Sequence, residues 1–242
     1  QLGTFLLGKL AVGASLNSLM QVIDYASLLI IRNDIQTLKK TRNNISPISQ
    51  FILALDKDFV NLNLFADDIT LYAETAHPNL SISGDKKSFT HEAQPQKVQT
   101  NPERFDSTVC ALGSPGFSSG KHYWEVDVGS SRDWDLGVAR KEIQRKGKLS
   151  LSPKEGFWVL GLNGKDYWAK TDPWTRVMVK NNIKKIGVYL SYQDRQVTFF
   201  SVNDGSKLFT FNDCSFTEEV RPFFKNSHKE STMRICSIRE DE

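Results

Sequence analysis

Two adjacent carboxylates, Asp67 and Asp68, are the residues whose spacing comes nearest to a catalytic motif. They directly precede the strand-like run Ile69–Leu71. Paired aspartates at the end of a strand can hold Mg²⁺ for phosphoryl chemistry. Such a centre also needs a third carboxylate on a neighbouring strand and a domain built around it. The residues that follow have the pattern of a β-sandwich, so we expect no metal site at this pair.

Other residue types that carry chemistry are sparse. The sequence has no P-loop, no H-E-x-x-H and no G-x-G-x-x-G motif, and its four histidines are isolated. The cysteines Cys110, Cys214 and Cys236 form no C-x-x-C pair or Cys/His cluster, which excludes a structural zinc site of the usual kind. We therefore expect neither catalysis nor a bound cofactor or metal within this chain.

Charge and cysteine content bear on partners and location. The formal net charge is +3, from 31 Lys+Arg and 28 Asp+Glu, which is too balanced to indicate a nucleic-acid partner. The basic runs Arg145–Lys148 and Lys180–Lys185 are expected to be solvated loops. A sparse, odd set of cysteines is typical of reduced thiols, and predicts a cytoplasmic protein, with the nucleus as the alternative. Without an initiating Met, the chain is expected to be part of a longer product.

Residues 1–60 have a helical pattern. Apolar side chains recur at alternating steps of four and three residues: Val12, Leu16, Leu19, Ile23, Ala26 and Ile30. This heptad seam predicts the end of a coiled coil followed by a linker, and a homodimer formed through the helix. A helix packed against its own domain is the alternative. Asp24 interrupts the apolar run, so we expect no insertion into a membrane.

From Ala66 onward the hydrophobic period changes to two. Alternating runs occur at His122–Val128, Trp134–Val138, Ile186–Tyr192 and Met233–Ile238, with turn residues between runs, as at Asn163-Gly164. Many short strands with regular turns predict an antiparallel sandwich, so we expect a mainly β fold after the helical segment.

The tryptophans divide into two groups. Trp124 and Trp158 lie within strand patterns and are expected in the core. Trp168 and Trp174 lie in the polar stretch 163–176, which we interpret as a connection between strands. Tryptophans on loops of a rigid scaffold commonly anchor a protein partner. A ring tucked beneath its own loop is the alternative.

An ordered series of sequence blocks resembles the PRY-SPRY (B30.2) domain of tripartite-motif proteins and butyrophilins. The blocks are Asp68–Leu71, Thr75–Leu80, Asn101–Phe105, Leu112-Gly113, Gly116–Val126, Trp134–Val138, Arg145–Gly147, Gly156–Trp158, Gly187–Leu190, Val197–Phe200, Phe209–Phe211, Cys214–Phe216 and Arg221–Phe224. The resemblance covers residues 66–242. It implies a PRY part at 61–115 and a SPRY part at 116–242, which together form one bent, jelly-roll-like sandwich.

The resemblance also implies a function. In tripartite-motif proteins this domain recognises a protein, and a RING elsewhere carries the ubiquitin-ligase chemistry; no RING or B-box cysteine pattern is present here. We therefore expect a non-catalytic recognition domain of a tripartite-motif-type E3 ubiquitin ligase, attached to a dimerising helix. A cytoplasmic ligand-sensing domain of a butyrophilin-like receptor is the alternative.

The family's known ligands help to select candidate contact residues. The antibody-Fc-binding member has an acidic residue, two Trp and a Phe in its pocket, and these positions correspond to Asp135, Gly161, Asn163 and, approximately, His228. Three of the four differ, so Fc binding is not expected. Phosphoantigen-binding butyrophilins have a His at the position of Asp135, where a carboxylate would repel phosphate.

The predicted contact surface for a protein combines these positions with the second tryptophan group. It comprises Asp135, Gly161, Asn163, Trp168, Trp174 and His228, together with the loop Gly84–Thr100. For Asp135 we keep one alternative role, which is to accept hydrogen bonds from the backbone of a neighbouring loop.

Overall fold

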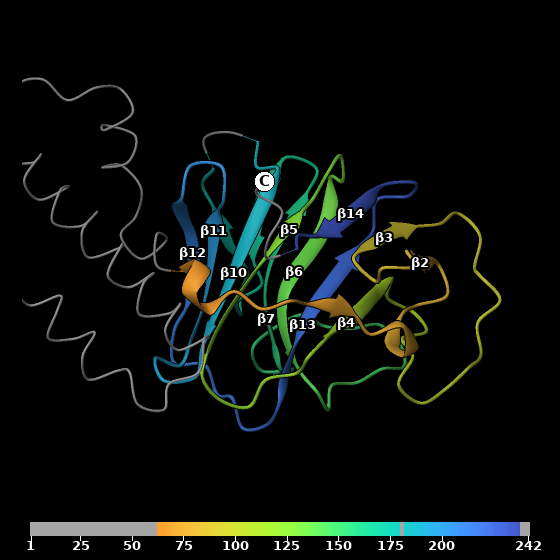
Figure 1. Ribbon diagram of the computed structural model, residues 1–242, viewed down its shortest axis with the longest axis horizontal. Coiled ribbons are helices and arrows are strands. Elements are labelled where there is room, and N and C mark those ends of the chain that lie inside the picture. Colours follow the sequence, from red (N-terminus) through yellow and green to blue (C-terminus); the bar gives the residue numbers. More distant parts are fainter. Residues whose placement is uncertain (1–61, 180–181, 238–242) are drawn as a thin grey trace, which may run out of the picture. The chain divides into compact units, whose positions relative to one another are not determined.

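A computed structural model describes residues 62–179 and 182–237, which fold as two stacked antiparallel sheets (Figure 1). The first sheet has the strand order β1 (Thr70–Leu71), β4 (Cys110–Ser114), β13 (Val220–Asn226), β6 (Asp133–Arg140), β7 (Phe157–Asn163), β8 (Asp166–Ala169), β9 (Thr175–Val177). The second has the order β12 (Ser206–Phe211), β11 (Gln196–Ser201), β10 (Lys185–Ser191), β5 (Lys121–Asp127), β14 (Thr232–Ile235), β3 (Ser88–His91), β2 (Leu80–Ile82). Two short 3₁₀ helices, η1 (Leu62–Phe65) and η2 (Ala73–Thr75), complete the described part.

The prediction of a mainly β antiparallel sandwich is confirmed. The last predicted strand ends at Ile235 rather than at Ile238. The helical segment 1–60, with its predicted coiled coil and dimer, lies outside the described residues. No helix of the described residues is long and apolar enough to cross a membrane.

The main core lies between the two sheets. Alternate residues of β5 and β6 face it, as the period of two predicts: Trp124, Val126, Trp134, Leu136 and Val138 are all at most 2 % exposed. Trp158 of β7 joins them, which confirms the expectation that Trp124 and Trp158 are core residues. The outer face of each sheet carries a separate apolar cluster.

The outer face of the first sheet is half covered by connecting segments. A second apolar cluster, which includes Phe105, Leu112, Phe157 and Phe223, lies on that side. The segment around residue 104 and the connection from β6 to β7 are tied together by Lys146, whose Nζ donates to the carbonyls of Asn101 (2.9 Å) and Arg104 (2.6 Å). The side chain of Arg145 is only 10 % exposed. The expectation that Arg145–Lys148 is a solvated run is therefore wrong for Arg145, because its guanidinium packs over the ring of Phe105, whereas Lys146 and Lys148 are exposed.

Part of the outer face of the second sheet is covered by the beginning of the described chain. Leu62 of η1 packs in a third cluster with Tyr123, Tyr189 and Phe200. The segment after η1 continues along β5, where the N–H of Asp67 donates to the carbonyl of Tyr123 at 2.8 Å. The described part of the chain therefore begins at the second sheet and not at the first.

The two adjacent carboxylates of this entry segment have separate partners. Asp67 Oδ2 lies 3.0 Å from Nδ1 of His122, and Asp68 Oδ1 lies 2.5 Å from Nζ of Lys87. Lys87 is buried and also donates to the carbonyl of Ile69. The pair thus attaches the entry segment to two different places, and the two carboxylates do not converge on one ion.

The His122–Asp67 contact makes the stability of this attachment depend on pH. The ring of His122 stacks on Phe117, with centroids 3.7 Å apart, and its Nε2 lies 2.7 Å from the carbonyl of Ser119. Burial by itself lowers the pKa of His122. The Asp67 carboxylate and the Ser119 carbonyl outweigh burial and raise that pKa above its ordinary value of 6.5. A raised pKa in the folded state stabilises the fold fully below the unfolded pKa, and this contribution is lost as pH rises through the folded pKa.

We predict that His122→Gln lowers the thermal midpoint more at about pH 5.5 than at about pH 8.5, because only the protonated ring donates to both acceptors. Thermal unfolding of both proteins at the two pH values measures this. Asp67→Asn, which removes the acceptor, should show the same pH dependence. If the variant lowered the thermal midpoint equally at both pH values, a charged His122–Asp67 contact would be contradicted.

Candidate functional site

The part of the first sheet's outer face that the second cluster leaves open forms a cavity of about 800 Å³. Its lining comes from six places in the chain: residues 107–109, β6, residues 148–151, the end of β7, the β8–β9 connection, and the end of β13. Segments of both the PRY and the SPRY parts therefore meet at one hollow.

Strand register explains which side chains share this face. Five residues on five neighbouring strands are directly opposite one another in the ladder: Lys225, Asp135, Gly161, Trp168 and Arg176. Directly opposed residues of an antiparallel pair project to the same side of the sheet. The five positions thus form one row across the outer face, although in the sequence they are spread between residues 135 and 225.

Asp135 is the charged centre of this row. It is only 3 % exposed. Its Oδ2 accepts from Nζ of Lys225 at 2.7 Å, and its Oδ1 lies 3.3 Å from Nζ of Lys170 without an aligned hydrogen bond. Its partners are thus two ammonium groups, and not the loop backbone of the alternative role. Asp135 contributes charge and support at the cavity floor rather than contact area.

Gly161 is required by this ion pair. A Cβ atom built on Gly161 would lie 2.1 Å from Asp135 Oδ1 and 3.0 Å from Cε of Lys170. The absent side chain leaves room for the carboxylate and for the lysine that crosses to it. Gly161 is therefore buried beside this ion pair without lining the cavity itself, and any side chain here would displace the charges.

Trp174 lies at the rim of the cavity, and a lysine contacts one face of its ring. Its side chain is the second most exposed large hydrophobic of the described residues, at 55 %. Nζ of Lys170 lies 3.4 Å from the centroid of its ring, and Lys170 itself is buried. A desolvated cation over an aromatic face contributes on the order of 2 kcal/mol. The ring is thus fixed in place from below while much of its surface is open to a partner.

The remaining predicted contact residues lie at different distances from the cavity. Asn163 is exposed at the end of β7 and lines it. Trp168 lies within β8 and is half-buried, so its assignment to a connection between strands is wrong, whereas that of Trp174 is confirmed. His228 follows β13 and its Nδ1 accepts from the N–H of Arg132 at 3.1 Å, but it does not line the cavity. The loop Gly84–Thr100 does not line it either.

Three lysines of the cavity were not identified from the sequence: Lys148, Lys170 and Lys225. Lys225 lies in a strand pattern directly after the block Arg221–Phe224. Alternation alone would have placed its side chain on the opposite face of the strand from that of Phe224. Neither that pattern nor any motif indicates that its partner is Asp135, ninety residues away in sequence.

A serine-hydrolase interpretation fits the geometry poorly. The run Gly116–Gly120 has the spacing G-x-S-x-G and is close to the Asp67–His122 pair. However, it leads into β5 rather than into a helix, and Nε2 of His122 bonds the backbone carbonyl of Ser119 instead of a hydroxyl. Burial raises the pKa of the Cys214 thiol to about 12, so that thiol is no nucleophile. The described residues contain no group of three or more potential metal ligands.

We predict that Asp135→Ala destabilises the fold by about 3 kcal/mol, because removal of one partner leaves two lysine charges close together in a desolvated site. Chemical denaturation of the purified variant measures this. Asp166→Ala is the matched control, since that carboxylate pairs with Arg176 on the exposed part of the same sheet and should cost well under about 1 kcal/mol. Equal losses for the two variants would contradict the role of the buried pair.

Comparison with known proteins agrees with this architecture. Residues 69–117 match the model of the SPRY-associated domain (PRY), and residues 121–238 match that of the SPRY domain. Ret finger protein-like 4A of Rattus norvegicus is 36% identical over 223 residues, which cover 88% of this chain and 77% of that protein. Butyrophilin subfamily 1 member A1 of Bos taurus is 42% identical over 161 residues, which cover 66% of this chain and 31% of the relative.

Among solved structures, that of the TRIM65 PSpry domain superposes with a TM-score of 0.66 at 20% identity, over 75% of this chain and 96% of the other. At that identity the likeness shows the fold alone. The two family matches and the relatives show more than the fold, and together they establish that this chain belongs to the PRY-SPRY (B30.2) family of the tripartite-motif and butyrophilin superfamily.

Proposed function

We propose that the cavity on the outer face of the first sheet, with Trp174 at its rim, binds a protein partner without catalysing a reaction. The observation that carries this proposal is the Trp174 ring, which is 55 % exposed and held from below by the buried Lys170. A large, immobilised aromatic side chain next to a hollow is typical of the residues that dominate protein–protein binding energies.

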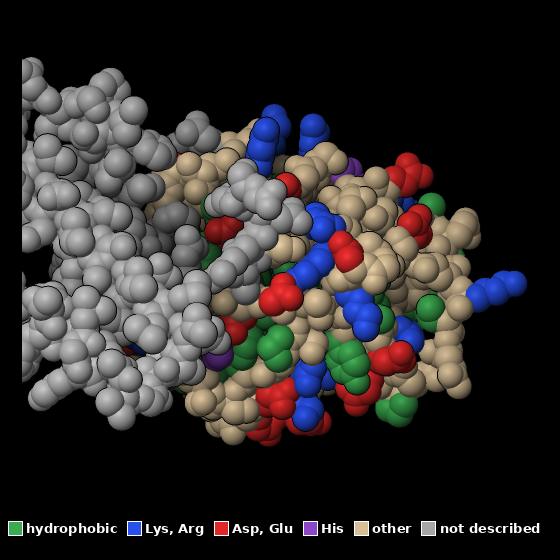
Figure 2. Space-filling view, in the orientation of Figure 1, with side chains coloured by type: hydrophobic (Ala, Val, Ile, Leu, Met, Phe, Trp, Pro, Cys, Tyr) green, Lys and Arg blue, Asp and Glu red, His purple; other side chains and the backbone are tan. Residues whose placement is uncertain are grey.

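The charges of the site favour a protein over a nucleic acid or a phosphate compound. Two carboxylates, Asp133 and Asp135, oppose the ammonium groups of Lys170 and Lys225 at the floor. An approximately neutral floor offers little attraction to a polyanion. On the face that Figure 2 shows, acidic and basic side chains are interspersed over the described surface, without a continuous basic patch.

For the whole protein we propose the recognition arm of a tripartite-motif-type E3 ubiquitin ligase, acting in the cytoplasm. The relatives include Zinc finger protein RFP of Homo sapiens, which is 38% identical over 166 residues that cover 68% of this chain and 32% of that protein.

 The chain spans about a third of the length of this relative and of the butyrophilin, so the activity of the whole protein is a proposal. The sparse, unpaired cysteines support a reducing compartment.

A receptor is the second candidate. Butyrophilin subfamily 1 member A1 of Bos taurus has a higher identity, 42%, over the shared region, which supports a cytoplasmic ligand-sensing domain of a butyrophilin-like receptor. Cysteine patterns in the residues upstream of Gln1 distinguish the two parents: RING and B-box spacing supports the ligase, and immunoglobulin spacing supports the receptor.

We also propose that residues 1–60 join two copies of the chain. The support is the heptad seam of the sequence, which includes Leu16 and Ile23. Two linked copies would present two cavities, and simultaneous binding of both would strengthen weak individual contacts.

We predict that the full chain sediments as a dimer and that the double variant Leu16→Asp/Ile23→Asp sediments as a monomer, because two buried charges disrupt an apolar seam. Analytical ultracentrifugation measures this. Asn17→Asp/Ser18→Asp, which adds equal charge beside the seam, is the control and should stay dimeric. A monomeric wild-type chain would end the dimer proposal.

We predict that Trp174→Ala weakens partner binding about 30-fold, equivalent to about 2 kcal/mol, while the thermal midpoint falls by only a few degrees. Partner proteins captured by the full chain are identified, and their affinities for both forms are measured by calorimetry. Arg195→Ala is the control, since Arg195 is an exposed residue that pairs with Asp213 outside the cavity. Unchanged affinity in the Trp174 variant would refute this binding surface.

A further inference from the structure

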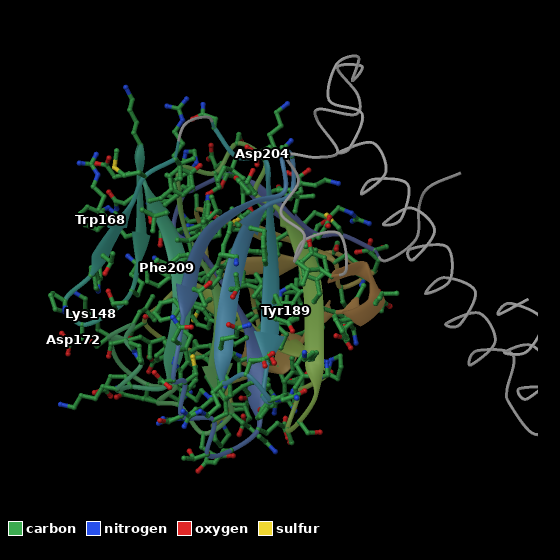
Figure 3. All side chains as sticks on the ribbon, turned by 90° about the vertical axis from the view of Figure 1, so that its left-hand side faces the viewer. Lys148, Trp168, Asp172, Tyr189, Asp204 and Phe209 are labelled. Atoms are coloured by element: carbon green, nitrogen blue, oxygen red, sulfur yellow. The ribbon has the colours of Figure 1, made fainter. Side chains whose placement is uncertain are left out.

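Strand β9 is an edge strand of the first sheet. Its residues Thr175–Val177 pair with β8 on one side, and no strand of the described residues pairs with them on the other. An unpaired sheet edge presents backbone N–H and C=O groups at the spacing of a β-ladder. Figure 3 shows Trp168, on the neighbouring strand β8, at one edge of the described sandwich.

The side chains along this edge are unusually exposed and apolar. Met178 is 83 % exposed and Trp174 is 55 % exposed, the two highest values among the large hydrophobic residues described. Arg176 stands between them and is also exposed. Trp174 lines the outer-face cavity, and Arg176 is opposite Trp168 on that same face. Alternation along an extended chain places Met178 on this side as well.

We propose that the free edge of β9 binds an extended segment of the partner protein as an eighth strand. This inference rests on the proposed function and specifies how the partner is held. Residues of the added strand directly opposite Trp174, Arg176 and Met178 are spaced by two. The chemistry of these three side chains selects an apolar, an acidic and an apolar residue, with one residue between each. The pattern is the same whether the added strand runs parallel or antiparallel.

Charge identifies the partner segment more closely. Arg176 pairs with Asp166 at 2.5 Å, but both side chains are about half exposed, so a second carboxylate can reach the guanidinium. A second copy of this chain, paired symmetrically about Arg176, would place two guanidinium groups opposite each other, which is destabilising. An acidic segment from a different protein therefore fits this edge better than a dimer of edges does.

The test uses a display library of random linear peptides selected on the full chain. We expect the selected peptides to carry Asp or Glu with apolar residues two positions to either side. Arg176→Glu should weaken their binding at least about ten-fold, and replacement of the peptide's acidic residue by Lys should restore it. Met178→Ser should also weaken binding. Arg195→Glu, an equal charge change outside this edge, should have no effect.

Two further outcomes separate this inference from the proposed function. If peptides are lost in Trp174→Ala and Asn163→Ala but bind Arg176→Glu and Met178→Ser normally, the cavity binds proteins and the added strand is refuted. If no peptide with the expected spacing is selected, the inference also fails. Methylation of alternate peptide amides gives a direct readout, because only the amides that join the ladder should lose affinity when methylated.

Discussion

The buried carboxylate of Asp135 is the interaction on which the rest of the site depends. It joins two strands and a connection, since Lys225 comes from β13, Asp135 from β6, and Lys170 directly follows β8. A charge in this position is stable only while both ammonium groups remain near it. The absence of a side chain at Gly161 and the position of the Trp174 ring both follow from the path of Lys170.

The two sheets differ in how their outer faces are used. On the second sheet, Leu62 and the entry segment pack against Tyr123, Tyr189 and Phe200, so that part of the outer face attaches the chain. The first sheet is covered over only part of its width, by the cluster around Phe157 and Phe223. The uncovered remainder holds the cavity and the free edge β9, so the proposed binding surface lies where the apolar packing ends.

Local patterns were sufficient to predict β5, β6, β10 and β14 and the core residues that β5 and β6 contribute. Alternation at His122–Val128 and Trp134–Val138 identified which residues face the inter-sheet core, because burial on one side of a strand is a property of neighbours in sequence. The site was only partly predictable. Asp135, Gly161, Asn163 and Trp174 were placed near one another by the family resemblance and the loop argument, whereas Lys170 and Lys225 depend on strand order, which alternation does not encode. Trp168 was misassigned because a short edge hairpin with polar residues looks like a connection.

The entry of the chain on one layer and the cavity on the other have a mechanical consequence. The contacts of Leu62, Asp67 and His122 attach the entry segment, which begins at residue 62, to the second sheet. A partner held at the first sheet would pull on the opposite side of the sandwich. Tension between the partner and the entry segment must cross both sheets through the side chains that interdigitate between them. Such a force acts perpendicular to the sheets, so it does not shear the hydrogen-bonded ladders.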